Sequence, residues 1–78
     1  MYVLEGKKLD RAVTLIGRAL DEDPENGAYN DSMGWALYKQ GDVTSALDYL
    51  ERAKEYSPDD PVVLDHLELV RKELTTRN

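Results

Sequence analysis

The residues best suited to chemistry are few in this chain, and His66 is its only histidine. On a helix, a second metal ligand would have to lie three or four residues away from it. Those positions hold Val62, Val63, Leu69 and Val70, none of which binds metal. The sequence therefore predicts no metal site around His66, which we interpret as a surface or half-buried side chain.

The sequence also lacks the residues that nucleophilic catalysis or phosphate binding would require. Ser32, Ser45 and Ser57 have no nearby base with an orienting acid, and the five glycines form no phosphate-binding motif. The chain has no cysteine, which removes disulfides and thiolate ligands and leaves the redox compartment open. The carboxylate pair Asp59–Asp60 has a simpler use at the start of a helix. We therefore expect no enzymatic activity and no cofactor.

The size and charge of the chain limit which kind of protein it can be and which partners it can bind. The 78 residues are enough for one small domain, residues 1–78. A net charge of −6 without a basic stripe argues against a nucleic-acid partner. No apolar run approaches the roughly 20 residues that span a bilayer, so we expect no membrane insertion. A soluble protein of the cytoplasm, the periplasm or the cell envelope fits these features equally well.

The spacing of apolar residues, prolines and capping residues predicts an all-α protein of about four helices. The expected helices span about residues 8–22, 27–40, 42–56 and 61–74. Gly41 suits a left-handed helix end, and Asp42 suits the cap of the next helix. Residues 75–78 are expected to fray.

A shift of the sequence by 34 residues aligns four identical pairs. These pairs are Ala12 with Ala46, Arg18 with Arg52, Ala19 with Ala53, and Pro24 with Pro58. Small residues at helical spacing let two helices approach closely, so the pattern predicts repeated antiparallel helical hairpins. The chain is therefore expected to begin inside a repeat, with residues 1–4 ending an earlier helix and Gly6 near a turn.

The same spacing resembles the tetratricopeptide repeat, whose 34-residue unit pairs two antiparallel helices. The residues that carry the resemblance are Met33, Gly34, Leu37, Ala46, Leu50, Ala53 and Pro58, with Asn30 where the motif usually has tryptophan. Residues 31–38 and 59–67 look like those of bacterial members, which are often envelope-associated. The resemblance implies an α-solenoid fragment. Its parts are a partial repeat (1–26), a complete repeat (27–60) and a C-terminal capping helix (61–78).

The fourth helix breaks the repeat pattern. A shift of 34 residues brings Gly34 onto Glu68 and Leu37 onto Arg71. A glutamate could not enter a seam shaped for glycine without burying a charge. We therefore expect this helix to pack on one side and to present a polar outer face, as terminal helices of repeat arrays do.

Nine residues on the second and fourth helices occupy the face that the resemblance assigns to a concave groove. They are Asp31, Trp35, Tyr38, Lys39, Val62, Asp65, His66, Leu69 and Lys72. Because tetratricopeptide proteins hold an extended peptide or a partner helix in this groove, the resemblance implies a protein-interaction module. Trp35 is the expected anchor, and the sequence leaves open whether it faces the groove or the core.

Charge and apolar surface suggest two kinds of partner. Asp31 and Asp65 would oppose a carboxylate ligand, so an apolar or mildly basic segment suits the groove better. The alternative role is structural, because one apolar face of the first helix lacks an expected neighbour. That face carries Leu9, Val13, Ile16 and Leu20, and it would pack within a longer repeat protein or pair with another copy as a homo-oligomer.

Overall fold

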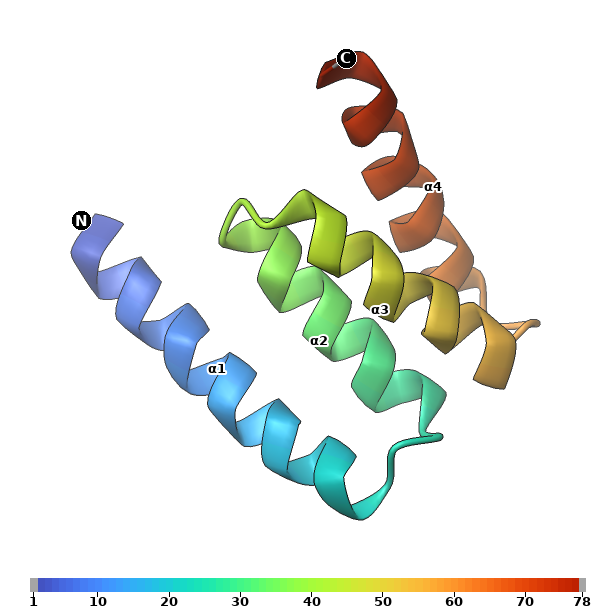
Figure 1. Cartoon of the computed structure of the whole chain (residues 1–78), viewed down its shortest axis with the longest axis horizontal. Coiled ribbons are helices and arrows are strands. Elements are labelled where there is room, and N and C mark those ends of the chain that lie inside the picture. Colours follow the sequence, from blue (N-terminus) through green and yellow to red (C-terminus); the bar gives the residue numbers. More distant parts are fainter. Residues whose placement is uncertain (1, 78) are drawn as a thin grey trace.

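Four α-helices form the protein in the computed structural model (Figure 1). The structure describes residues 2–77, with the side chains of residues 8–76. The helices are α1 (Tyr2–Glu22), α2 (Gly27–Lys39), α3 (Val43–Tyr56) and α4 (Pro61–Arg77). Since the described residues include no strand, the prediction of an all-α helical fold is confirmed.

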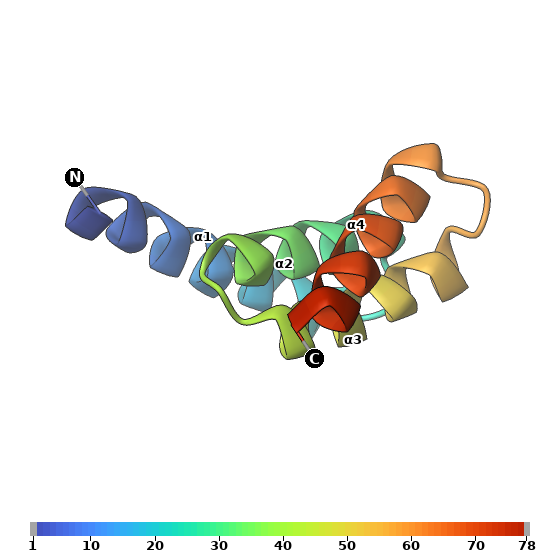
Figure 2. The same cartoon turned by 90° about the horizontal axis from the view of Figure 1, so that it is seen from above.

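The helices pack in series. Each contacts the next along the chain, and α2 also contacts α4. Helices α1, α2 and α3 lie side by side in alternating directions, whereas α4 returns from the end of α3 at an angle to it (Figures 1 and 2). The molecule measures 36 × 35 × 17 Å, so it is a thin layer with long exposed faces.

The turn between α2 and α3 follows the predicted capping. Gly41 has φ +90°, a left-handed conformation that favours glycine, and Asp42 accepts a hydrogen bond from the Ser45 backbone N–H at 3.3 Å. At the start of α2, Asn26 accepts from the Tyr29 backbone N–H at 3.0 Å. These side chains satisfy donors that a helix start leaves unpaired, and so they fix where α2 and α3 begin.

Two predictions at the ends of the chain are wrong. Helix α1 runs without a break from Tyr2 to Glu22, so there is no turn at Gly6. Glycine permits a left-handed backbone without requiring it, and Gly41 is the only described residue with positive φ. Helix α4 continues to Arg77 instead of fraying from Thr75. The hydroxyls of the two threonines in its last turn donate to backbone carbonyls four residues earlier.

Helices α2 and α3 meet at a seam of small residues. A Cβ atom on Gly34 would lie 2.7 Å from Leu50 Cγ and 3.0 Å from the Ala46 carbonyl oxygen. Ala46, Leu50 and Ala53 are fully buried. The close approach therefore depends on the missing side chain at Gly34, as the sequence pattern predicts.

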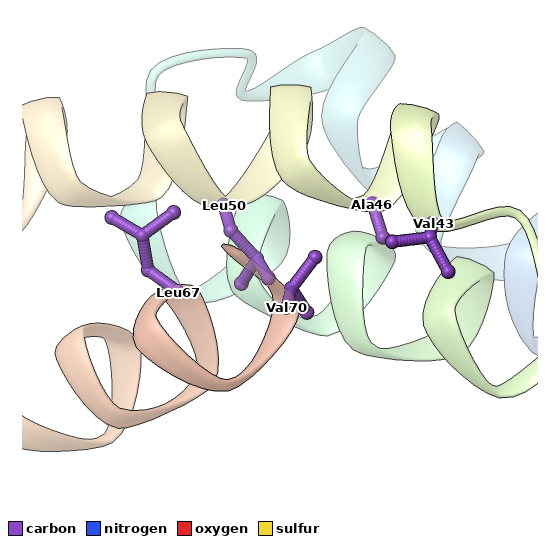
Figure 3. Packing of buried hydrophobic residues seen from close by; sticks show 5 residues of the cluster. All are labelled: Val43, Ala46, Leu50, Leu67 and Val70. Carbon is purple, nitrogen blue, oxygen red and sulfur yellow. The ribbon is translucent and has the colours of Figure 1, made fainter. Parts of the chain in front are cut away.

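The core continues from α3 to α4. Figure 3 shows Leu67 and Val70 of α4 reaching toward Leu50 of α3. Glu68 is exposed, and Arg71 is exposed at the border of this core, where its Nη2 lies 3.0 Å from Glu51 Oε2 of α3. These charged side chains of α4 therefore stay exposed while its apolar residues pack on α3.

Asn30 is a buried polar residue in the first turn of α2. Its side chain is 1% exposed, and its amide Nδ2 donates to the carbonyl oxygens of Pro24, at 3.1 Å, and Asn26, at 2.9 Å. Both acceptors lie in the connection between α1 and α2. Asn30 therefore ties this connection to α2 at the position where the repeat motif usually has tryptophan.

Candidate functional site

The first cross-helix contact on the predicted groove face joins Asp31 of α2 to His66 of α4. Asp31 Oδ1 and His66 Nδ1 are 2.8 Å apart, and the side chains are 15% and 23% exposed, respectively. An ionised carboxylate can only accept, so Nδ1 carries the hydrogen and donates it to Asp31. This bond fixes the orientation of the imidazole ring.

The imidazole ring stacks on Trp35. The ring centroids of His66 and Trp35 are 4.1 Å apart at an interplanar angle of 15°, and Tyr38 stacks on Trp35 at 5.1 Å and 28°. Trp35 is half-buried between α2 and α4. The sequence left open whether Trp35 faces the groove or the core. In the structure its side chain is intermediate, since it is neither fully buried nor fully exposed.

Two further contacts surround this stack. The Tyr38 hydroxyl donates to Glu73 Oε2 of α4 at 2.5 Å. Lys39 Nζ lies 5.1 Å from the centroid of the Trp35 ring, within the range of a cation–π interaction. Three of the four predicted residues on α2 thus contact α4 directly, and the fourth contacts Trp35.

Two open hollows lie along the side of α4 that carries Leu69. One, of about 440 Å³, is lined by Leu69, Lys72, Glu73 and Thr76. The other, of about 400 Å³, is lined by Asp65, His66, Glu68, Leu69 and Lys72. Leu69 and Lys72 border both hollows, and Leu69 is 44% exposed. The structure therefore brings together four predicted residues of α4: Asp65, His66, Leu69 and Lys72.

The charges around these hollows are mainly negative. Asp65, Glu68 and Glu73 contribute carboxylates, and Lys72 contributes an ammonium group. The whole chain has a net charge of −6. The charge around the hollows and the charge of the whole chain therefore have the same sign.

Among the predicted site residues of α4, one lies apart from the hollows. Val62 is 52% exposed in the first turn of α4, where its backbone N–H donates to the Asp60 side chain at 3.0 Å. It lines neither hollow. Conversely, Glu68, Glu73 and Thr76 line the hollows and were not predicted.

Some of the residues that were not predicted could have been found from the sequence. Glu73 lies 34 residues after Lys39, so applying the repeat shift to Lys39 would have placed Glu73 on the groove face as well. The Asp31–His66 pair was missed because partners of His66 were sought on its own helix. Thr76 lies in a segment that was expected to fray.

The described residues offer no site for a metal ion. Nowhere among them do three histidine or acidic side chains gather closely enough to hold one. In the same part of the chain, every helix is too short or too polar to cross a membrane.

The antiparallel hairpins and the small-residue seam define a helical-repeat protein. Residues 3–67 match the family model described as tetratricopeptide repeat, and the chain belongs to this family. Proteins of this family generally mediate protein–protein interaction on a non-catalytic scaffold.

The chain is similar to the bacteriophage adsorption protein A of Escherichia coli (strain K12). It is 33% identical over 63 residues, which are 81% of this chain and 6% of that protein. The chain therefore spans a small fraction of this relative. No solved structure gives a significant match.

Proposed function

We propose that the protein binds an apolar and basic segment of a partner protein on the surface formed by α2 and α4. This surface, the α2–α4 face, comprises the two hollows of α4 and the stacked rings beside them. The observation that carries the proposal is Leu69, which is 44% exposed, borders both hollows and has carboxylates around it. An exposed leucine in such a setting suits an apolar side chain of a partner.

The hollows are of a size that suits side chains of a partner. Ligand pockets have volumes of roughly 300–1,000 Å³, a range that includes both hollows. Their open shape fits a segment laid along α4 better than an enclosed small molecule. Apolar side chains would contact Leu69 on both of its sides.

The charge distribution supports a basic partner. Asp65, Glu68 and Glu73 would attract lysine or arginine side chains next to the apolar contacts, and a C-terminal carboxylate would be repelled. Glu73 also accepts a hydrogen bond within the chain, from the Tyr38 hydroxyl, and Asp31 accepts one from His66. The expected role of Asp31 is to hold the ring stack in place and so to pre-organise the face.

Trp35 supports this face rather than serving as its main anchor. Its ring is half-buried and contacts Tyr38 and His66. A partner would reach it beside Lys39, whose ammonium group lies over the same ring. Since Trp35 is the only tryptophan, its fluorescence reports binding at this face.

Two sets of synthetic helical peptides test the proposal. Both sets have leucines at helical spacing (i, i+3, i+4, i+7). The remaining positions carry mainly lysine in one set and mainly glutamate in the other, and each peptide is titrated against the chain while Trp35 emission is followed. The lysine peptides should bind at least tenfold more tightly, and their affinity should fall as salt is added.

A matched pair of leucines on α4 provides the control. Leu69→Ser should weaken binding at least fivefold. Leu64→Ser should leave it unchanged, because Leu64 is 38% exposed but lines a hollow on the other side of α4. Equal binding of both peptide sets, or equal effects of the two substitutions, would contradict the proposal.

A further inference from the structure

The imidazole ring of His66 has one nitrogen that is available to a ligand. Its Nδ1 donates to Asp31 Oδ1 at 2.8 Å, so Nε2 carries no hydrogen in the neutral ring and can only accept. Within the described part of the chain, no residue bonds to Nε2. It is not buried either, because no buried side-chain nitrogen or oxygen of the described residues lacks a partner. His66 therefore presents one accessible acceptor that the fold does not use.

The contacts of His66 hold this acceptor in a fixed direction. The bond to Asp31 sets the rotation of the ring, and the stack on Trp35, with 4.1 Å between ring centroids, sets its plane. The His66 side chain is 23% exposed. A group that is already held in place loses little conformational freedom when a partner binds. Nε2 is thus a pre-organised hydrogen-bond acceptor.

Charged groups lie near His66 on two helices. They are Asp31 and Lys39 of α2 and Asp65, Glu68 and Lys72 of α4. No described residue of α1 or α3 lines the hollow of about 400 Å³ to which His66 belongs. While the imidazole is neutral, three carboxylates stand against two ammonium groups. The acceptor therefore lies in a setting with an excess of negative charge.

The second hollow, of about 440 Å³, offers a different setting. It is lined by Leu69, Lys72, Glu73 and Thr76, so it has one carboxylate, one ammonium group and no imidazole. Leu69 borders both hollows. The hollow of His66 therefore suits a basic side chain better than its neighbour does, and Leu69 offers apolar contact directly beside it.

We infer that the hollow of His66 selects a lysine or arginine side chain of the partner, whose N–H group donates to His66 Nε2. This inference rests on the proposed function and names the residue that recognises the basic side chain. Asp65 and Glu68 would attract the positive charge, and the bond to Nε2 would be a charge-assisted hydrogen bond. An apolar side chain one turn away on the partner would contact Leu69.

The same geometry makes binding depend on the protonation of His66. A second proton goes to Nε2, because Nδ1 already carries one and keeps its bond to Asp31. It turns the acceptor into a donor, and its charge cancels the excess of the surrounding carboxylates. Histidine side chains generally change charge between about pH 5 and 8. Binding of a basic segment should therefore weaken as the pH falls through this range.

Peptides that keep their charge and lose their N–H donors test the inference. The lysine peptides are compared with versions in which every lysine is trimethyllysine, which is positively charged and has no side-chain N–H. Each peptide carries a label, and its fluorescence anisotropy is followed as the full chain is added. The full chain should bind the lysine peptides at least fivefold more tightly at about pH 8. This preference should shrink at least threefold at about pH 5.5.

Two substitutions of His66 separate its acceptor from its other contacts. In His66→Asn the amide nitrogen reaches about as far as Nδ1 and can still donate to Asp31, but no atom takes the place of Nε2. In His66→Gln the amide oxygen reaches about as far as Nε2 and accepts without titrating. The preference for lysine should fall at least threefold in His66→Asn. His66→Gln should keep more of it, with the same value at both pH values.

Loss of the ring stack is controlled by this pair, because both variants lack the imidazole that stacks on Trp35. The carboxylates of Asp65 and Glu68 are also the same in both, so their own bonds to lysine cancel in the comparison. Circular dichroism checks that the variants fold, which is expected because His66 lies outside the buried apolar cluster. The trimethyllysine and pH comparisons need no variant at all.

Four results would overturn the inference. They are an equal preference for lysine in the unmodified chain and in His66→Asn, an unchanged preference at the two pH values, identical behaviour of His66→Asn and His66→Gln, and tighter binding of the trimethyllysine peptides. In each case binding of the lysine peptides would still support the proposed function. If neither kind of peptide binds, the proposed function fails and the inference fails with it.

Discussion

Gly17 and Gly34 both lie inside helices, yet their surroundings differ. An alanine at position 34 would place its Cβ 2.7 Å from Leu50 Cγ and 3.0 Å from the Ala46 carbonyl oxygen. Overpacking of this kind costs about 1–3 kcal/mol, more than the better helix propensity of alanine returns. We predict that Gly34→Ala lowers the free energy of unfolding by about 1 kcal/mol or more, as measured by urea denaturation.

Gly17 provides the matched control at the same scale. An added Cβ there would lie 3.8 Å from Met33 Cε, an ordinary van der Waals contact. Gly17→Ala should therefore stabilise the protein by about 0.5–1 kcal/mol through helix propensity alone. If both substitutions changed stability in the same direction, the seam at Gly34 would not be as tight as described.

At the scale of the helices, α2 and α4 are joined mainly by polar and aromatic contacts. A double-mutant cycle with Asp31→Ala and His66→Ala should give a coupling energy of about 1 kcal/mol, because the two side chains share a hydrogen bond that is mostly shielded from water. Trp35 emission should change in His66→Ala, which loses the stacked ring. Asp65→Ala, at an exposed neighbour of His66, should change stability by less than about 0.5 kcal/mol. A coupling energy near zero would contradict this role of the pair.

The sequence predicted the helices well where a local residue determines the backbone. Gly41 and Asp42 fix the turn between α2 and α3, and each acts through its own conformation or its own side chain. Gly6 misled the prediction because a glycine can also continue a helix. At the end of α4, two threonine hydroxyls bond back to the helix, an arrangement that has no clear signal in the sequence.

The candidate site was predictable as a face but not as a set of contacts. Helical spacing predicted Trp35 and Leu69 on one surface, and His66 lies next to both, because it stacks on Trp35 and lines a hollow together with Leu69. The bond between Asp31 and His66 depends on how α2 and α4 are placed relative to each other across 35 residues of sequence. Spacing within one helix contains no such information. Asn30 was likewise noted only as a departure from the motif, and its burial depends on the path of the preceding loop.

At the scale of the whole molecule, the helices are packed in series, so their stabilities should differ. Helix α3 contacts both α2 and α4, whereas α1 contacts only α2 within the described residues. In repeat proteins, stability depends on interfaces between neighbours, and end elements open first. We predict that amide hydrogens of α1 exchange at least tenfold faster than those of α3 in native-state hydrogen exchange. Equal rates in the two helices would show instead that the chain opens as a single cooperative unit.

Gly34 and Trp35 are adjacent in sequence and face different neighbours. The first lies at the seam with α3, and the second contacts α4. One helix therefore keeps its scaffold positions and the positions of the proposed binding face on separate sides. Libraries randomised at Tyr38, Lys39, Leu69 and Lys72 should retarget the protein to new sequences while the hairpin geometry stays the same.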